Sequence, residues 1–136
     1  MKHILIASAL ALVATQVFAK DTYPPLDVLL KTDKTVTGQP IRYPEGQAEI
    51  TMAIVALQPG QSTPLHHHEA PLAGYILQGE LTADYGSEGI HVYRTGDAIV
   101  EALGTEHVGT NSGDDILRIL VVFAGAQGTP NTVIDD

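Results

Sequence analysis

Short segments of alternating polarity, separated by turn residues, run through most of this chain and constrain its fold more than any other feature. In the segment from Glu49 to Leu57, Ile50, Met52 and Ile54 occupy alternate positions, as in a strand with a buried face. Glycine, asparagine and aspartate separate such segments at intervals of about eight to twelve residues, a spacing typical of all-β sandwiches and barrels. Beyond the N-terminus, no segment has a convincing helical period. We expect strands at residues 49–57, 72–78, 81–85, 90–93, 98–102 and 116–123.

The N-terminal residues 1–19 have the composition of a secretory signal peptide. Lys2 precedes an apolar run from Ile4 to Val13, and small residues stand where a signal peptidase reads them, at Val17–Ala19. A membrane anchor needs about 20 apolar residues, whereas this run is shorter and is followed by Lys20-Asp21. We therefore expect cleavage after Ala19 and a mature protein that is periplasmic or secreted, with no stable membrane anchor.

The charge balance excludes partners that need a basic surface. Sixteen Asp and Glu residues against seven Lys and Arg residues give a formal net charge of −9 at pH 7, so nucleic acid and anionic lipid are poor partners. The chain contains no cysteine. Disulfides and thiolate ligands are therefore excluded, and any bound metal must be held by nitrogen and oxygen atoms.

The sequence between the signal peptide and the first long strand predicts an N-terminal arm. Residues 20–45 combine four prolines with a short apolar patch, Leu26–Leu30, and we expect one or two edge strands there. The barrel domain would then comprise residues 46–136. Because the apolar residues between Leu26 and Ile41 could cover an exposed sheet edge, we also expect a homodimer.

Three histidines indicate a metal site. His66 and His68 are two residues apart, so on an extended strand their rings leave the same face, while His67 leaves the opposite one. His107 follows a glycine-containing turn and could supply a third nitrogen from a neighbouring strand. Neutral imidazole is the commonest protein ligand for transition metals. A run of histidines can also be an exposed metal-scavenging tract, but such a tract would not require His107.

The other histidines of the barrel domain and three of the tyrosines are interpreted as structural residues. We expect His67 and His91 to be packed or surface residues. Three tyrosines lie in predicted strands and are interpreted as half-buried packing residues: Tyr75, Tyr85 and Tyr93. Tyr75 and Gln78 are also minor candidates for lining a pocket, because they lie near the first histidines.

The spacing of these residues resembles that of the cupin superfamily, whose small barrels carry two linked motifs. The first motif is matched by Gly60, His66, His68 and Gly79. The second is matched by Gly96, Gly104, His107 and Asn111. The resemblance covers roughly residues 46–123. It implies a cupin jelly-roll β-barrel, also called a double-stranded β-helix, and metal ligation by His66, His68 and His107.

Two positions depart from the cupin pattern. Leu72 stands where the first motif has a glutamate ligand, and Ala102 stands where the second has a proline. Three outcomes are open: a three-histidine site completed by water, a substitute carboxylate from Glu69 or Glu101, or weak or absent metal binding. Strict alternation turns Glu69 outward. Glu101 lies in an apolar segment, where a carboxylate must face solvent or have a cationic partner.

Two classes of function fit these residues. The first is a metal-dependent small-molecule enzyme that uses Fe, Mn, Ni or Zn, with a dioxygenase-type oxidation as the first choice and lyase or isomerase chemistry as the others. The second is a non-catalytic periplasmic module that binds a metal or a small ligand, which Leu72 favours. A barrel without metal is the remaining interpretation. No catalytic residue is assigned, and Glu101 is the candidate.

Overall fold

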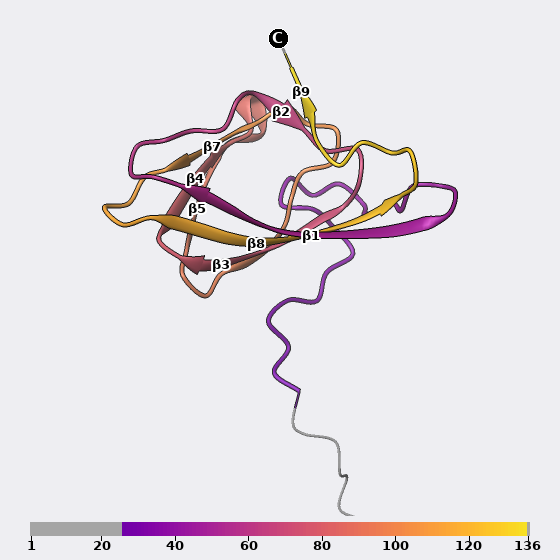
Figure 1. The fold of residues 1–136 in the computed structure, drawn as a ribbon, viewed down its shortest axis with the longest axis horizontal. Helices are drawn as coiled ribbons and strands as arrows, with labels where there is room; N and C mark the ends of the chain where they lie inside the picture. Colours follow the sequence, from indigo (N-terminus) through magenta and orange to yellow (C-terminus); the bar gives the residue numbers. More distant parts are fainter. Residues whose placement is uncertain (1–25, 136) are drawn as a thin grey trace, which may run out of the picture.

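The computed structural model describes residues 26–135, and the chain in this range is built almost entirely of antiparallel strands (Figure 1). The predicted signal peptide and the start of the predicted arm lie outside these residues. Among residues 26–135, no helix is long and apolar enough to cross a membrane. The strands are β1 Ala48–Leu57, β2 His66–His67, β3 Leu72–Gln78, β4 Glu80–Asp84, β5 Ile90–Arg94, β6 Ala98–Val100, β7 Val108–Asn111, β8 Leu117–Ala126 and β9 Val133–Ile134.

These strands form a jelly-roll barrel from two main sheets and a short third one. The larger sheet has the order β1-β8-β3-β6, and the smaller one has the order β5-β4-β7. The two-stranded sheet β2-β9 lies at the top of the barrel in Figure 1, near the C-terminus. All strand pairs are antiparallel, as the alternating pattern of a half-buried sheet predicts.

The six expected strands all form, with shifted ends. The expected strand 98–102 stops at Val100, and the last long strand continues beyond Phe123 to Ala126. Strand β7 and the two-residue β9 were not expected as strands. Gly79 explains how the chain passes from β3 in one sheet to β4 in the other. It has a φ of 87°, and a Cβ atom there would lie 2.9 Å from the carbonyl oxygen of Ile116, so only glycine fits.

The core lies between the two main sheets and is contributed mostly by inward-facing residues of β3, β4 and β8. Along β8, alternate residues are buried, as a period of two requires. The buried apolar cluster consists of Leu57, Leu72, Ile76, Leu81, Ala83, Tyr85, Ala102, Leu117, Ile119, Val121 and Phe123.

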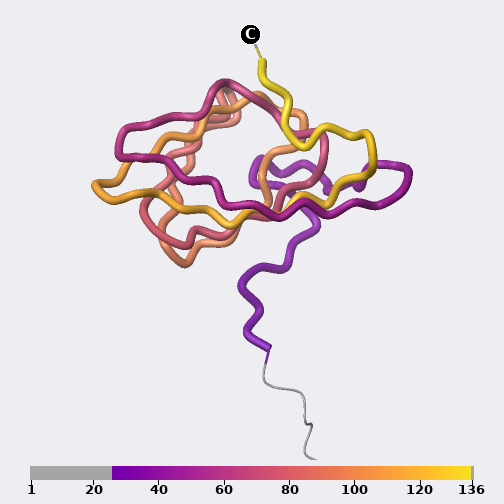
Figure 2. Tube along the Cα trace, in the orientation of Figure 1, coloured from indigo at the N-terminus to yellow at the C-terminus, as the bar shows by residue number. Residues whose placement is uncertain are grey.

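The expectation of one or two edge strands in the arm is wrong for its described part. Residues 26–47 contain only an isolated bridge, between Lys34 and Pro40. The physical reason is local: Pro40 has no N–H to donate, so the backbone pairing is limited to the bonds from Thr35 N–H to Gln39 and from Ile41 N–H to Asp33 on either side of the bridge. The side chains of Thr35 and Gln39 add a bond of their own. In Figure 2 the first described residues run away from the barrel, on the side opposite the C-terminus.

Candidate metal centre

The three histidines meet because β2 and the residue before β7 form a narrow backbone bridge. His66 N–H donates to the carbonyl of His107 over 3.1 Å, and His107 N–H donates back over 2.8 Å. Directly opposed residues of an antiparallel pair project from the same face. His68 lies two residues further along, so it joins the same face. The three rings are buried, with exposed fractions of 2–8 %.

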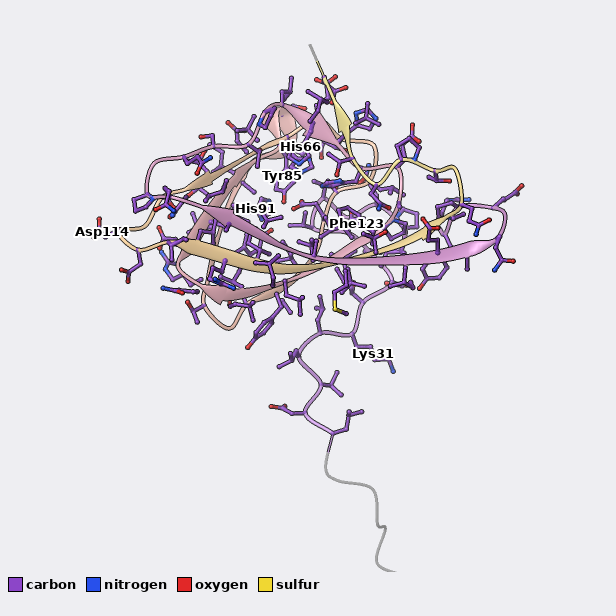
Figure 3. All side chains as sticks on the ribbon, viewed as in Figure 1. Lys31, His66, Tyr85, His91, Asp114 and Phe123 are labelled. Carbon is purple, nitrogen blue, oxygen red and sulfur yellow. The ribbon has the colours of Figure 1, made fainter. Side chains whose placement is uncertain are left out.

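The three rings converge closely enough to share one ion. The ring centroids of His66 and His107 are 4.3 Å apart, and those of His68 lie 5.0 Å and 5.1 Å from His66 and His107. One ring nitrogen of each lies within 4.8 Å of the others. His66 lies near the top of the barrel in Figure 3, with Tyr85 below it and Phe123 on the opposite sheet.

Hydrogen bonds fix which nitrogen of each ring faces the cavity. The Nδ1 atom of each ring lies 2.9 Å from a backbone carbonyl: that of Pro64 for His66, Asn131 for His68 and Thr105 for His107. A carbonyl can only accept, so each Nδ1 carries the proton and donates it. The Nε2 lone pair of each ring is then free for a ligand, which is the usual arrangement of metal-binding histidines.

Burial favours the neutral form of two of these rings. Loss of solvent lowers the pKa of His68 from 6.5 to about 4, although the bond to the Asn131 carbonyl opposes this change. The pKa of His66 is lowered for the same main reason. Neutral imidazole is the form that binds metals, so burial prepares both rings for ligation near pH 7.

Glu101 is the carboxylate that the structure places at this site. It directly follows β6, and its N–H donates to the carbonyl of Leu72 over 2.9 Å, so it is the cross-strand neighbour of that residue. The side chain is buried, and its Oε2 lies 4.0 Å from Nε2 of His107. Glu69 is exposed. Of the two alternative carboxylates, only Glu101 faces the histidines.

Tyr85 holds Glu101 in place, and its interpretation as a half-buried packing residue is wrong. It is only 2 % exposed, and its hydroxyl donates a hydrogen bond to Oε1 of Glu101. The same oxygen accepts the Ala102 N–H over 3.1 Å. Burial and the adjacent carboxylate raise the pKa of Tyr85 well above its usual value, so it stays a neutral donor. Strand alternation places Leu81, Ala83 and Tyr85 on one inward face, so the sequence pattern already indicated that Tyr85 is buried.

Four other side chains singled out from the sequence do not join the three histidines. His67 points to the other side of β2 and pairs with Asp135 over 2.8 Å. His91 stacks on Tyr93 with an interplanar angle of 11° and also packs edge-on against Tyr85. Their expected packing or surface roles agree with these contacts. Tyr75 is half-buried and Gln78 exposed, and neither lines the central cavity, so the expectation of a pocket role for them is wrong. Tyr75 lies on the outer face of β3, and a register shift between Ile76 and Gln78 places Gln78 opposite the exposed Arg118 on that same face.

The histidines open into an apolar cavity of about 230 Å³. Its polar members are confined to one end, and its other walls are aliphatic or aromatic. The basic residues in the described part of the chain are all exposed, and none lines the cavity: Lys31, Lys34, Arg42, Arg94 and Arg118. Apart from a bound cation, this cavity therefore offers an anion no positive charge. It is lined by residues of β1, β3, β4 and β8 and by the C-terminal Thr132 and Ile134.

The C-terminal segment is a part of the site that sequence reasoning missed. Strand β9 pairs with β2, and the Asn131 carbonyl that orients His68 comes from the residues just before β9. The side chain of Asn131 donates to the hydroxyl of Thr51 over 2.9 Å, which ties this segment to β1. The contact to His68 is made by a backbone atom, so the residue type carried no signal for it.

Comparisons with known proteins agree with this architecture. The cupin domain family matches residues 53–123. No curated protein sequence matches the chain. Among solved structures, oxalate decarboxylase from Lactobacillus farciminis, in a formate complex, is 28% identical with a TM-score of 0.54; the match covers 65% of this chain. This chain thus spans about a quarter, 27%, of that enzyme's length.

Two further solved structures share the fold at lower identity. The polyketide cyclase RemF from Streptomyces resistomycificus is 23% identical with a TM-score of 0.55, and the match covers 67% of this chain and 63% of that one. The DMSP lyase DddQ from Ruegeria pomeroyi is 22% identical with a TM-score of 0.53, over 62% of this chain and 42% of that one. At these identities the likeness is one of fold.

Proposed function

This chain belongs to the cupin family, and we propose that it is a metal-dependent enzyme acting on a small molecule. His66, His68 and His107 would hold one divalent transition metal, Fe, Mn, Ni or Zn. One observation carries the proposal: each of the three buried rings donates Nδ1–H to a backbone carbonyl and leaves Nε2 free to bind. Three ligands leave further coordination positions open, as in catalytic rather than structural sites.

Glu101 has a defined part in this proposal. Its carboxylate supplies, from the neighbouring strand, the negative charge that Leu72 lacks. Tyr85 holds that carboxylate with one hydrogen bond, and the apolar walls keep bulk water away from the polar end. A bound redox-active ion such as iron supplies the electron transfer that oxidation by dioxygen needs, whereas zinc or nickel supplies Lewis acidity. Oxidation of the dioxygenase type is our first choice of reaction.

Elemental analysis of untagged protein tests the site directly. We expect about one equivalent of metal in the wild type and loss of that metal in His66→Ala. His67→Ala is the matched control, because its ring is adjacent in sequence but pairs with Asp135 outside the site. Metal that is absent from the wild type, or lost equally in both variants, would contradict the proposal.

A non-catalytic binding module is the second candidate. It is favoured by Leu72 in the position of the expected glutamate and by the absence of any other ionisable side chain besides Glu101 and the histidines among the described residues that line the cavity. Oxygen consumption by the iron-loaded protein with a panel of β-diketones and thiols distinguishes the two. Consumption that requires the protein and is lost in His107→Ala supports the enzyme. Tight ligand binding without turnover supports the module.

We also propose that this protein forms a homodimer through the outer face of the larger sheet. Met52, Val122, Ala73 and Val100 are cross-strand partners and form one apolar row over β1, β8, β3 and β6. Exposed apolar residues of the arm line a groove beside this row. The large exposed side chains on this side are Leu26, Val28, Leu29, Leu30, Tyr43, Ile50, Met52 and Ile54.

The exposed apolar area supports a second copy as the occupant of this face. At on the order of 100 Å² each, the eight side chains expose roughly 800 Å², which is what one partner of a standard interface buries and more than a monomer usually exposes. Light scattering at micromolar concentration should give the mass of a dimer, and Met52→Glu should give a monomer. Ile90→Glu, on the outer face of the other sheet, should remain dimeric. A monomeric wild type would contradict the proposal.

Export remains a proposal that rests on the sequence. Lys2 and the apolar run after it support removal of residues 1–19 during export to the periplasm or the medium. N-terminal sequencing of the protein from an exported fraction should begin at Lys20. Full-length protein that stays in the cytoplasm would contradict it.

A further inference from the structure

The charges and shape of the cavity restrict the class of molecule that fits beside the metal. Resting on the function proposed above, we infer that the site takes a chelating oxygen ligand with a single negative charge and an apolar, ring-sized body, and disfavours small dianions such as oxalate. The inference comes from a charge count around the histidines and from the composition of the remaining walls.

The charge count is simple because few ionisable groups surround the site. The three imidazoles donate Nδ1–H and offer a lone pair, so they are neutral ligands. Glu101 brings one negative charge, and Tyr85 donates to it as a neutral phenol. A divalent cation at the histidines would therefore carry one uncompensated positive charge. A singly charged ligand brings the total to zero, whereas a dianion leaves one negative charge.

The rest of the cavity cannot absorb that extra negative charge. Its remaining walls are aliphatic or aromatic, including Leu81, Val121 and Phe123, and the basic residues of the described chain are all on the surface. An unpaired charge in such surroundings is strongly disfavoured. The carboxylate of Glu101, on the cavity wall, would repel it further. The net charge of −9 also opposes the entry of dianions.

The volume sets the size of the apolar body. A cavity of about 150 Å³ is enough to take up benzene, and this one has about 230 Å³. A single ring with two adjacent oxygen atoms therefore fits, while its apolar carbons lie against the walls. Oxalate has no apolar carbons beyond its two carboxylates, so it makes no apolar contacts with those walls.

Tropolone and oxalate are suitable probes for zinc-loaded protein. Tropolone chelates as a monoanion on a seven-membered ring, and its absorbance reports chelation; oxalate displaces it as a dianion. The ratio of the two dissociation constants is compared with the ratio for free zinc in the same buffer, which removes the intrinsic preference of the metal. We expect the wild type to favour tropolone by about tenfold or more relative to free zinc.

Two variants separate charge from shape. Glu101→Gln removes the negative charge and keeps the size, so it should shift the ratio towards oxalate by about tenfold. Ala83→Leu adds apolar bulk to the cavity wall beside Gly109, which has no side chain. It should weaken tropolone binding at least fivefold and leave oxalate binding unchanged. Zinc content is measured first for every variant, and a folded barrel is checked by circular dichroism.

The outcomes distinguish this inference from the proposed function. A wild-type protein that binds no zinc would overturn both. Zinc bound at one equivalent with the same tropolone-to-oxalate ratio as free zinc would overturn the inference alone. A ratio that Glu101→Gln does not change would also overturn it, because the charge count would then have no effect on selection.

Discussion

The two ends of the central cavity are held together by different physical means. At the polar end, formed by His66, His68, His107 and Glu101, each side chain has a specific hydrogen-bond partner that sets its direction. The apolar walls, which include Leu81 and Val121, are held by packing alone. Hydrogen bonds specify direction, whereas packing specifies volume.

This difference predicts how each end tolerates change. Loss of one polar side chain removes a donor atom and leaves its neighbours aimed at an incomplete site. Loss of a methyl group from the apolar walls only enlarges a space that already exists. Variants at the polar end should therefore alter metal and ligand binding more than the stability of the metal-free fold. Variants in the apolar walls should alter that stability more than metal binding.

The largest expected effect is on metal affinity in His107→Ala. Structural zinc sites bind with about 10–16 kcal/mol shared by four ligands, so one ligand is worth about 2.5–4 kcal/mol, or roughly a hundredfold to a thousandfold in affinity. Competition with a chromophoric chelator measures this. His67→Ala, whose ring pairs with Asp135 on the other side of β2, is the control and should bind as the wild type does. Equal metal affinities in the two variants would contradict the assignment of His107 as a metal ligand.

Acid should destabilise the metal-free protein through His68. Its pKa is about 4 in the folded chain and 6.5 when unfolded, so the unfolded chain binds more protons between these values. The free energy of unfolding should therefore fall as pH drops from 6.5 to 4, by up to about 3 kcal/mol. Urea titrations at several pH values test this. His68→Gln should flatten the curve, and an unchanged curve in that variant would contradict the role of burial.

Leu81→Ala should lower stability without lowering metal affinity. Leu81 is 4 % exposed and borders the cavity, so truncation should cost about 2 kcal/mol, the low end for such a change, because the space beside it is already open. Leu77→Ala is a control on the exposed face of β3 and should cost less than about 0.5 kcal/mol. If metal affinity fell together with stability in Leu81→Ala, the apolar walls and the polar end would not have separate roles.

Tyr85→Phe should have the smallest effect. The variant keeps the ring and removes the hydroxyl that holds Oε1 of Glu101. Such supporting hydrogen bonds are typically worth about tenfold in metal affinity. Tyr75→Phe is the matched control, because Tyr75 is half-buried and does not line the cavity. An equal affinity in both variants would show that Tyr85 only fills space.

Sequence reasoning reached the strands and the three histidines because both depend on local spacing. A period of two locates each strand and also places His66 and His68 on one face. It could not show that Glu101 adjoins Leu72, since that depends on the register between β3 and β6. The prediction of edge strands in the arm was wrong because its internal backbone pairing is limited to a short hairpin around the Lys34–Pro40 bridge, which side-chain hydrogen bonds of Thr35 and Gln39 reinforce.

The contribution of the C-terminal segment had no signal in the sequence. The atom that orients His68 is the backbone carbonyl of Asn131, which any residue type would carry. What brings it there is the pairing of two very short strands, β2 and β9. Contacts of this kind are set by tertiary structure, so only coordinates identify them.

Anomalous diffraction from crystals of the zinc-loaded protein tests the central claim most directly. The account predicts one ion among His66, His68 and His107, with three Nε2 atoms at about 2.0–2.1 Å. An ion bound instead by His67 and Asp135, or no ion near the three rings, would contradict it.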